Sequence, residues 1–92
     1  MTLATNDIAR SFGLTETELM EQALRRFLLE KRREILQERL GILVRYQVET
    51  IQQLEERIAT GEAIEHPGWE DLITVENLEA SLEEINEHLR TL

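Results

Sequence analysis

Carboxylates and two histidines are the side chains of this chain that could support catalysis or metal binding. The 92 residues include 19 acids, two histidines and no cysteine. A carboxylate-bridged di-iron site in a helical bundle uses Glu-x-x-His units. Here Ala63 stands three residues before His66, and Ile85 stands three residues before His88. Neither histidine completes that motif, so the sequence predicts no metal site of this kind.

Glu84 and His88 are four residues apart and would share one face of a helix. The ordinary account of His88 is an exposed side chain near a helix C-terminus, where a cation is favoured. The sequence has no glycine-rich phosphate loop, no zinc signature, and no serine, histidine and aspartate set in a recognisable context. We therefore expect no catalytic residue, no metal and no cofactor.

Negative charge is concentrated in the last third of the chain. Residues 61–92 hold nine acids and one base, a balance of −8, whereas residues 1–60 hold ten acids and nine bases, a balance of −1. An anionic segment that also carries a seam of apolar residues favours docking onto a basic surface. A sequence pI near 4.6 argues against tight binding of nucleic acid, because phosphate contacts need lysine and arginine.

The composition favours a small helical protein of the cytoplasm. The absence of cysteine excludes disulfides and cysteine-based zinc sites and fits a reducing compartment. No run of about eighteen apolar residues and no basic-then-apolar N-terminal segment occurs, so we expect neither a membrane span nor a signal peptide. With 4% aromatic and 32% charged residues, long helices that complete their core by association are expected.

Two local patterns predict how the first half begins. Residues 6–13 form a short helical pattern that Gly13 is placed to end. Thr15 and Glu18 then match a capping box, which predicts that a long helix begins directly after Thr15.

The long helix is predicted from apolar residues that recur every three or four positions towards residue 60. Around residues 40–48 apolar groups lie on nearly all sides, which requires contacts on more than one face. A second capping-box match begins at Thr50, so the sequence leaves open whether the helix is continuous or breaks near residues 47–50.

The C-terminal segment is predicted to be an acidic amphipathic helix behind a glycine- and proline-containing linker, residues 61–67. Its apolar residues follow a heptad pattern over about two and a half repeats. The residues of this seam are Val75, Leu78, Leu82, Ile85, Leu89 and Leu92.

These elements predict an all-α, coiled-coil-like helical oligomer, most simply a dimer. Residues 1–60 would form a helical dimerisation platform, residues 61–67 a linker, and residues 68–92 an acidic amphipathic binding arm. The residues predicted to mediate self-association lie on the long helix. They are Leu28, Ile35, Leu36, Leu40, Leu43 and Val44.

The C-terminal arm carries the residues predicted to bind a partner. Trp69 is the only tryptophan and lies beside a Pro-Gly pair, which is typical of an anchor in a partner's pocket, although packing within this protein's own bundle remains open. Acids between the seam residues would face the partner's bases. The predicted partner-binding residues are Trp69, Glu70, Asp71, Leu72, Val75, Glu76, Leu78, Glu79, Leu82, Glu83 and Ile85.

The N-terminal segment resembles the turn of a helix-turn-helix, in which alanine packs inside and glycine makes the bend. A recognition helix should begin with basic or amide side chains, yet this one begins with Glu16, Thr17 and Glu18. A DNA-binding regulator that uses residues 6–28 is therefore the third hypothesis. The more ordinary account is a helical hairpin in which Ile8, Phe12 and Leu14 pack on Leu19, Ala23 and Phe27.

Three elements between Arg45 and Leu82 carry a family resemblance. They read Gly-Glu at residues 61–62, His-Pro-Gly-Trp-Glu-Asp at residues 66–71, and Glu-Asn-Leu-Glu-Ala at residues 76–80. The chain resembles, over about two-thirds of its length, small helical prokaryotic proteins often assigned as antitoxins of type II toxin–antitoxin modules. In that group a Tyr-Gly-Val turn commonly follows a long helix, and Gln47 stands here in place of the glycine.

The resemblance implies that the chain neutralises a cognate toxin, often a ribonuclease or nucleotidyltransferase-like enzyme with a basic active site. Our first hypothesis is thus a non-catalytic antitoxin or inhibitor that dimerises and covers a basic, toxin-like enzyme with its acidic C-terminal helix. The alternative is a self-associating helical scaffold or assembly protein whose seam is satisfied within a homo-oligomer.

Overall fold

The computed structural model describes the backbone of residues 3–63 and 65–92 and the side chains of residues 4–63 and 67–92. These ranges form four helices and no strand. The helices are α1 (Leu3–Ser11), α2 (Glu16–Arg45), α3 (Ile51–Ala59) and α4 (Glu65–Thr91). The predicted all-α fold class, with a short first helix, a long central helix and a C-terminal helix, is confirmed.

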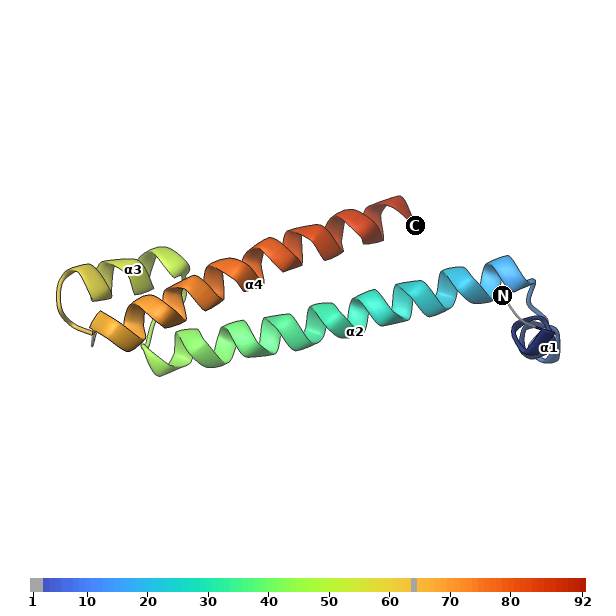
Figure 1. The fold of residues 1–92 in the computed structure, drawn as a ribbon, viewed down its shortest axis with the longest axis horizontal. Helices are drawn as coiled ribbons and strands as arrows, with labels where there is room; N and C mark the ends of the chain where they lie inside the picture. Colours follow the sequence, from blue (N-terminus) through green and yellow to red (C-terminus); the bar gives the residue numbers. More distant parts are fainter. Residues whose placement is uncertain (1–2, 64) are drawn as a thin grey trace.

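Helices α2 and α4 lie side by side as an antiparallel hairpin, and the chain extends 60 × 20 × 19 Å (Figure 1). Helix α3 packs on α4 where the hairpin turns back, and α1 packs on the opposite end of α2. We call residues 42–78 the closed end and residues 3–31 the open end.

The start of α2 is fixed by the predicted capping box, which is confirmed. The Thr15 hydroxyl accepts a hydrogen bond from the Glu18 amide at 3.0 Å, and the Glu18 carboxylate accepts one from the Thr15 amide at 3.1 Å. Gly13, with a φ of 71°, ends the preceding turn in the left-handed region that glycine adopts at little cost. These local bonds set where the long helix begins.

The long helix breaks where the sequence left the matter open. Helix α2 ends at Arg45, and α3 begins at Ile51 after Thr50, whose hydroxyl accepts from the Gln53 amide at 3.1 Å. Between them Gln47 has a φ of 55°, the conformation that glycine would adopt most easily. The turn therefore forms with a glutamine, and not a glycine, in the left-handed conformation.

The core lies at the closed end. Six apolar side chains from α2, α3 and α4 are buried against one another, with Leu54 and Val75 fully buried. Gly68 permits the close approach of α3 and α4, because a Cβ atom there would lie 2.9 Å from the Ile58 Cγ1 atom. The buried cluster consists of Ile42, Leu43, Leu54, Ile58, Leu72 and Val75.

Polar contacts set the register between α2 and α4. Arg25, Arg32 and Arg39 are seven residues apart on α2, and each reaches across to α4. From the closed end outwards the contacts are Arg45 to Asp71 at 3.3 Å, Arg39 to Glu79 at 2.9 Å, Arg32 to Asn86 at 3.2 Å, and Arg25 to the Leu92 carbonyl at 3.5 Å. We call these four arginines the arginine ladder.

The open end is packed less tightly than the sequence predicted. Helix α1 packs on α2, but Ile8, Phe12 and Phe27, which were expected to pack within a helical hairpin, are 50%, 75% and 59% exposed. Among the described side chains of α1, Ala9 is the buried one, and its carbonyl accepts from the Leu14 amide at 2.9 Å. A small alanine lets α1 pack on α2 while Ile8 and Phe12 remain at least half exposed.

The predicted division into platform, linker and arm differs from the observed hairpin. Helix α4 begins at Glu65, inside the predicted linker 61–67, and lies along α2 instead of extending from it. The side chain of His66 lies outside the described residues. The predicted arm is therefore one half of the hairpin in this chain.

Candidate functional site

The predicted partner-binding residues of α4 divide into an inward set and an outward set. Leu72 and Val75 belong to the buried core, so they are core residues and not partner contacts. Leu78, Leu82 and Ile85 continue the same stripe and are half-buried. The heptad seam was correctly identified, but the surface it meets is this chain's own α2.

Two predicted acidic contacts also bind within the chain. Asp71 accepts a hydrogen bond from the Tyr46 hydroxyl and forms an ion pair with Arg45, and Glu79 forms an ion pair with Arg39. Burial raises the pKa of the Tyr46 hydroxyl, and its hydrogen bond and charge interaction with Asp71 raise that pKa further. These two acids hold α4 against α2, whereas the other described acids of α4 are exposed, namely Glu70, Glu76, Glu83, Glu84 and Glu87.

The outward set forms a continuous face. Trp69, Glu76 and Glu83 remain exposed as predicted, and Trp69 retains 39% of its accessible surface. Ile73, which is 56% exposed, and Ala80 lie between them at helical spacing. Sequence reasoning missed these two, although their spacing of four and eleven residues from Trp69 places them on the same side of a helix.

Helix α3 supplies the other wall of this surface. A shallow groove of about 410 Å³ runs between α3 and α4, and its charged lining is entirely acidic. Within the part of the chain that the structure describes, Glu55, Glu76 and Glu83 form no ion pair with a base, whereas Glu79 is held by Arg39. We define the acidic face as Glu55, Trp69, Ile73, Glu76, Ala80 and Glu83.

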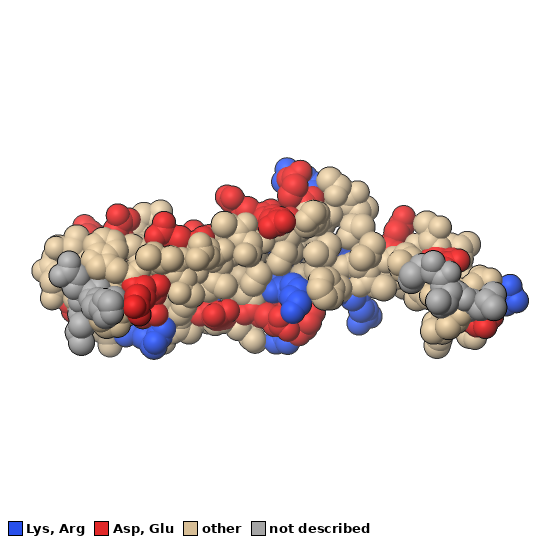
Figure 2. All heavy atoms as spheres, viewed as in Figure 1, with Lys and Arg blue, Asp and Glu red and all other residues tan. Residues whose placement is uncertain are grey.

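The charge of the hairpin is divided between its two long helices. Figure 2 shows acidic side chains along the edge where α4 runs and side chains of both signs along the edge where α2 runs. Helix α4 carries eight acids and one base, and α2 carries six acids and seven bases. Glu70 is also exposed, on a different side of α4 from the acidic face.

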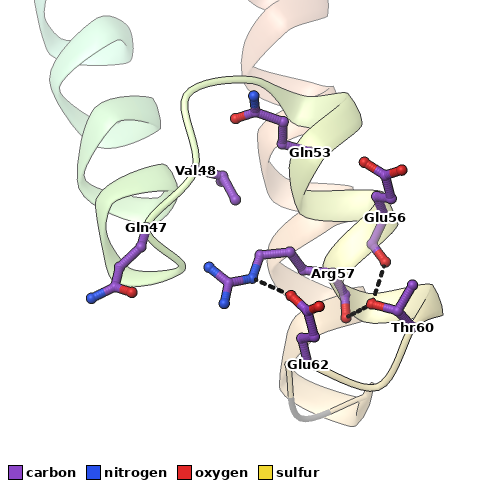
Figure 3. Close-up of a pocket in the computed structure, with 7 residues that line it drawn as sticks. All are labelled: Gln47, Val48, Gln53, Glu56, Arg57, Thr60 and Glu62. Atoms are coloured by element: carbon purple, nitrogen blue, oxygen red, sulfur yellow. Dashed lines mark hydrogen bonds and ion pairs between the residues drawn. The ribbon is translucent and has the colours of Figure 1, made fainter.

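A polar pocket of about 450 Å³ lies at the closed end (Figure 3). Its central side chain, Arg57, forms an ion pair with Glu62 at 3.2 Å and donates to the Tyr46 carbonyl at 2.6 Å. Thr60 donates to the carbonyl of Glu56 at 3.0 Å. Arg57 therefore ties the α2–α3 turn to the α3–α4 turn, and its contacts account for it as a brace of the fold.

The predicted self-association residues also divide. Leu43 is buried in the core, and Leu28 and Ile35 are half-buried. Leu36, Leu40 and Val44 are exposed, at 42%, 60% and 60%. These three exposed residues and Leu29 form a second apolar stripe on α2. The groove along this stripe is bordered by the cationic side chains of Arg32 and Arg33.

Among the described residues, the other candidates from the sequence do not come together as a binding site. Glu84 and His88 approach to 3.9 Å on an exposed surface. Among the described residues, no group of three or more histidine, aspartate and glutamate side chains is arranged to hold a metal ion. The first turn of α2 presents Glu16 and Glu18, which would repel phosphate. No helix in the described ranges is long and apolar enough to cross a bilayer.

Comparison with known proteins places the chain in a family. The family model described as the Uncharacterized protein MJ0235 family matches residues 1–92, so the chain belongs to that family. No curated protein and no solved structure matches the chain.

Proposed function

We propose that the chain is a non-catalytic protein-binding module, of the antitoxin or stoichiometric inhibitor kind, in the cytoplasm. The acidic face would dock on a basic surface of a partner protein, such as the substrate cleft of an enzyme that binds RNA. The observation that carries the proposal is that Glu55, Glu76 and Glu83 line one groove. Among the described residues, no ion pair with a base holds any of these three carboxylates.

The acidic face combines the two properties that a basic partner needs. Its carboxylates would steer a cationic protein into contact and exclude anionic competitors. Trp69 and Ile73 add exposed apolar surface at one end of the face, and an aromatic anchor of this kind can supply a large share of the binding energy. The groove floor adds Ile51 and Ala80.

The structure changes how such binding would work. An arm that folds on its partner would lose conformational entropy on binding, but α4 is already held along α2 by the core and the arginine ladder. We therefore propose rigid docking of the hairpin edge. Trp69→Ala with Ile73→Ala should weaken binding without unfolding the chain, because both side chains are exposed.

The partner can be identified by cross-linking in cells. A photo-crosslinking residue placed at Ile73, on the acidic face, should capture one basic protein. The same residue at Ser81, which is exposed on another side of α4, is the matched control. Capture of an acidic protein at Ile73, or equal capture at both positions, would contradict the proposal.

Charge reversal then tests the face directly. Glu76→Lys with Glu83→Lys should slow association with the captured protein by about tenfold or more at low salt. Glu34→Lys with Glu38→Lys makes the same change in net charge on α2, away from the acidic face, and should have a much smaller effect. Equal effects of the two double variants would show that net charge, and not the acidic face, governs binding.

The second candidate function is a self-associating helical scaffold. Among the side chains that the structure describes, seven of the eleven large apolar ones that are exposed lie on α1 and α2, and Phe12 lies directly after α1, which favours a further contact on that side of the hairpin. This candidate can coexist with the first, because the acidic face and these side chains lie on different helices.

A further inference from the structure

The open end of the hairpin has no cover from α4. The last contact of the arginine ladder joins Arg25 to the carbonyl of Leu92, which directly follows α4. Residues 16–24 of α2 therefore extend beyond the end of α4, by about 13 Å at the rise of an α-helix. Both phenylalanines of the chain, Phe12 and Phe27, are more than half exposed in this region.

One face of α2 in this region is apolar at its centre and charged at its ends. Glu16, Met20, Leu24, Phe27 and Lys31 follow one another at spacings of four, four, three and four residues, which places them on one side of a helix. Leu24 is 47% exposed and Phe27 is 59% exposed. The acid stands at one end of this face and the base at the other.

The first half of this region of α2 is acidic and the second half is basic. Residues 16–24 contain three acids and no base, a balance of −3, and residues 25–33 contain five bases and one acid, a balance of +4. When two such helices lie antiparallel, the acidic segment of each helix faces the basic segment of the other. A parallel pair would bring like charges together. The order of charge is therefore self-complementary in an antiparallel arrangement only.

We propose that the open end is an isologous interface with a second copy of this chain, in which two α2 helices cross antiparallel with the two-fold axis between Ala23 and Leu24. This register places Met20 against the partner's Phe27 and Glu16 against the partner's Lys31, each twice. In the single chain Lys31 pairs with Glu34 at 3.3 Å, an exposed pair that can be exchanged at little cost.

The second copy is placed here and not on the other exposed stripe of α2. The groove along Leu36 and Leu40 is bordered by Arg32 and Arg33, so two copies meeting there would bring like charges together. The proposed interface also leaves the acidic α4 helices outside the crossing. It is independent of the acidic face and of the partner proposed above.

The oligomeric state of the full chain tests the proposal. Light scattering after gel filtration should give twice the chain mass of 10.8 kDa for the unaltered protein. Phe27→Glu should give the monomer mass, whereas Leu40→Glu, at a site with the same exposure, should remain a dimer. Circular dichroism should show equal helix content in both variants. A monomeric unaltered protein, or dissociation by Leu40→Glu and not by Phe27→Glu, would overturn the proposal.

A charge exchange tests the antiparallel register. Glu16→Lys and Lys31→Glu should each raise the dimer dissociation constant by about threefold to tenfold, because each change places like charges together twice. The double variant should restore the original constant. Single variants without effect, or a double variant weaker than either single one, would exclude this register.

Discussion

The closed end and the open end of the hairpin use the same kinds of residue to different effect. At the closed end three helices bury six aliphatic side chains, and two turns are braced by Arg57. At the open end the small residue Ala9 is the one buried side chain among those that the structure describes, while Phe12 and Phe27 are more than half exposed. The difference shows that the chain buries an apolar core at one end and leaves large apolar side chains exposed at the other.

Truncation of a core side chain should separate the two ends most clearly. Leu54→Ala at the closed end should lower the free energy of unfolding by about 3 kcal/mol, because Leu54 is fully buried and its removal leaves a cavity. Leu40→Ala on the exposed stripe should change it by about 0.5 kcal/mol or less. Urea denaturation measures both, and equal losses would remove the distinction between buried and exposed apolar residues.

The α2–α3 turn should be improved by a glycine. Gln47 has a φ of 55°, so Gln47→Gly should raise the free energy of unfolding by about 1 kcal/mol through relief of the left-handed conformation. Gly13→Ala at the open end, where φ is 71°, is the opposite change and should destabilise by a similar amount. Thermal unfolding checks both, and a destabilised Gln47→Gly variant would contradict the assigned turn.

Tyr46 should make the closed end sensitive to alkaline pH. Its pKa is raised in the folded chain by burial and by Asp71, so its contribution to stability is present below about pH 10 and is lost as pH rises through the folded-state pKa. Tyr46→Phe should cost about 1 kcal/mol at neutral pH and remove this alkaline step. Tyr46 is the only tyrosine, so ultraviolet titration reports its ionisation alone. A titration at the pKa of a free tyrosine would contradict the buried contact.

The arginine ladder should contribute least to stability. Arg39→Gln removes the ion pair with Glu79, whose side chains are 28% and 37% exposed, and should cost about 0.5 kcal/mol. Arg45→Gln, whose side chain is 61% exposed, should cost less. Unfolding by urea at two salt concentrations measures these effects, and a larger loss for Arg45→Gln would reverse the expected dependence on burial.

Local signals in the sequence predicted the helices well. The capping box at Thr15 and the heptad seam of α4 are short-range patterns, and both appear in the structure. The break after Arg45 was one of two outcomes that the sequence left open, because the capping signal at Thr50 competed with a continuous apolar pattern.

Long-range pairing was harder to predict. The seam of α4 indicated an apolar partner, but nothing in its spacing distinguished a foreign surface from α2 of the same chain. The seven-residue spacing of Arg25, Arg32 and Arg39 was the available signal, since it matches a seam with a period of seven. The acids that Arg39 and Arg45 bind, Glu79 and Asp71, were instead predicted to face a partner.

Amide hydrogen exchange at several protein concentrations tests the central claim most directly, because it follows both ends in one experiment. The account predicts slow exchange at the core positions Leu43, Leu54 and Val75 at every concentration. It predicts that residues 16–27 exchange rapidly in dilute solution and slowly when the protein is concentrated. Exchange of residues 16–27 that does not depend on concentration, or a closed end that exchanges as fast as the open end, would contradict it.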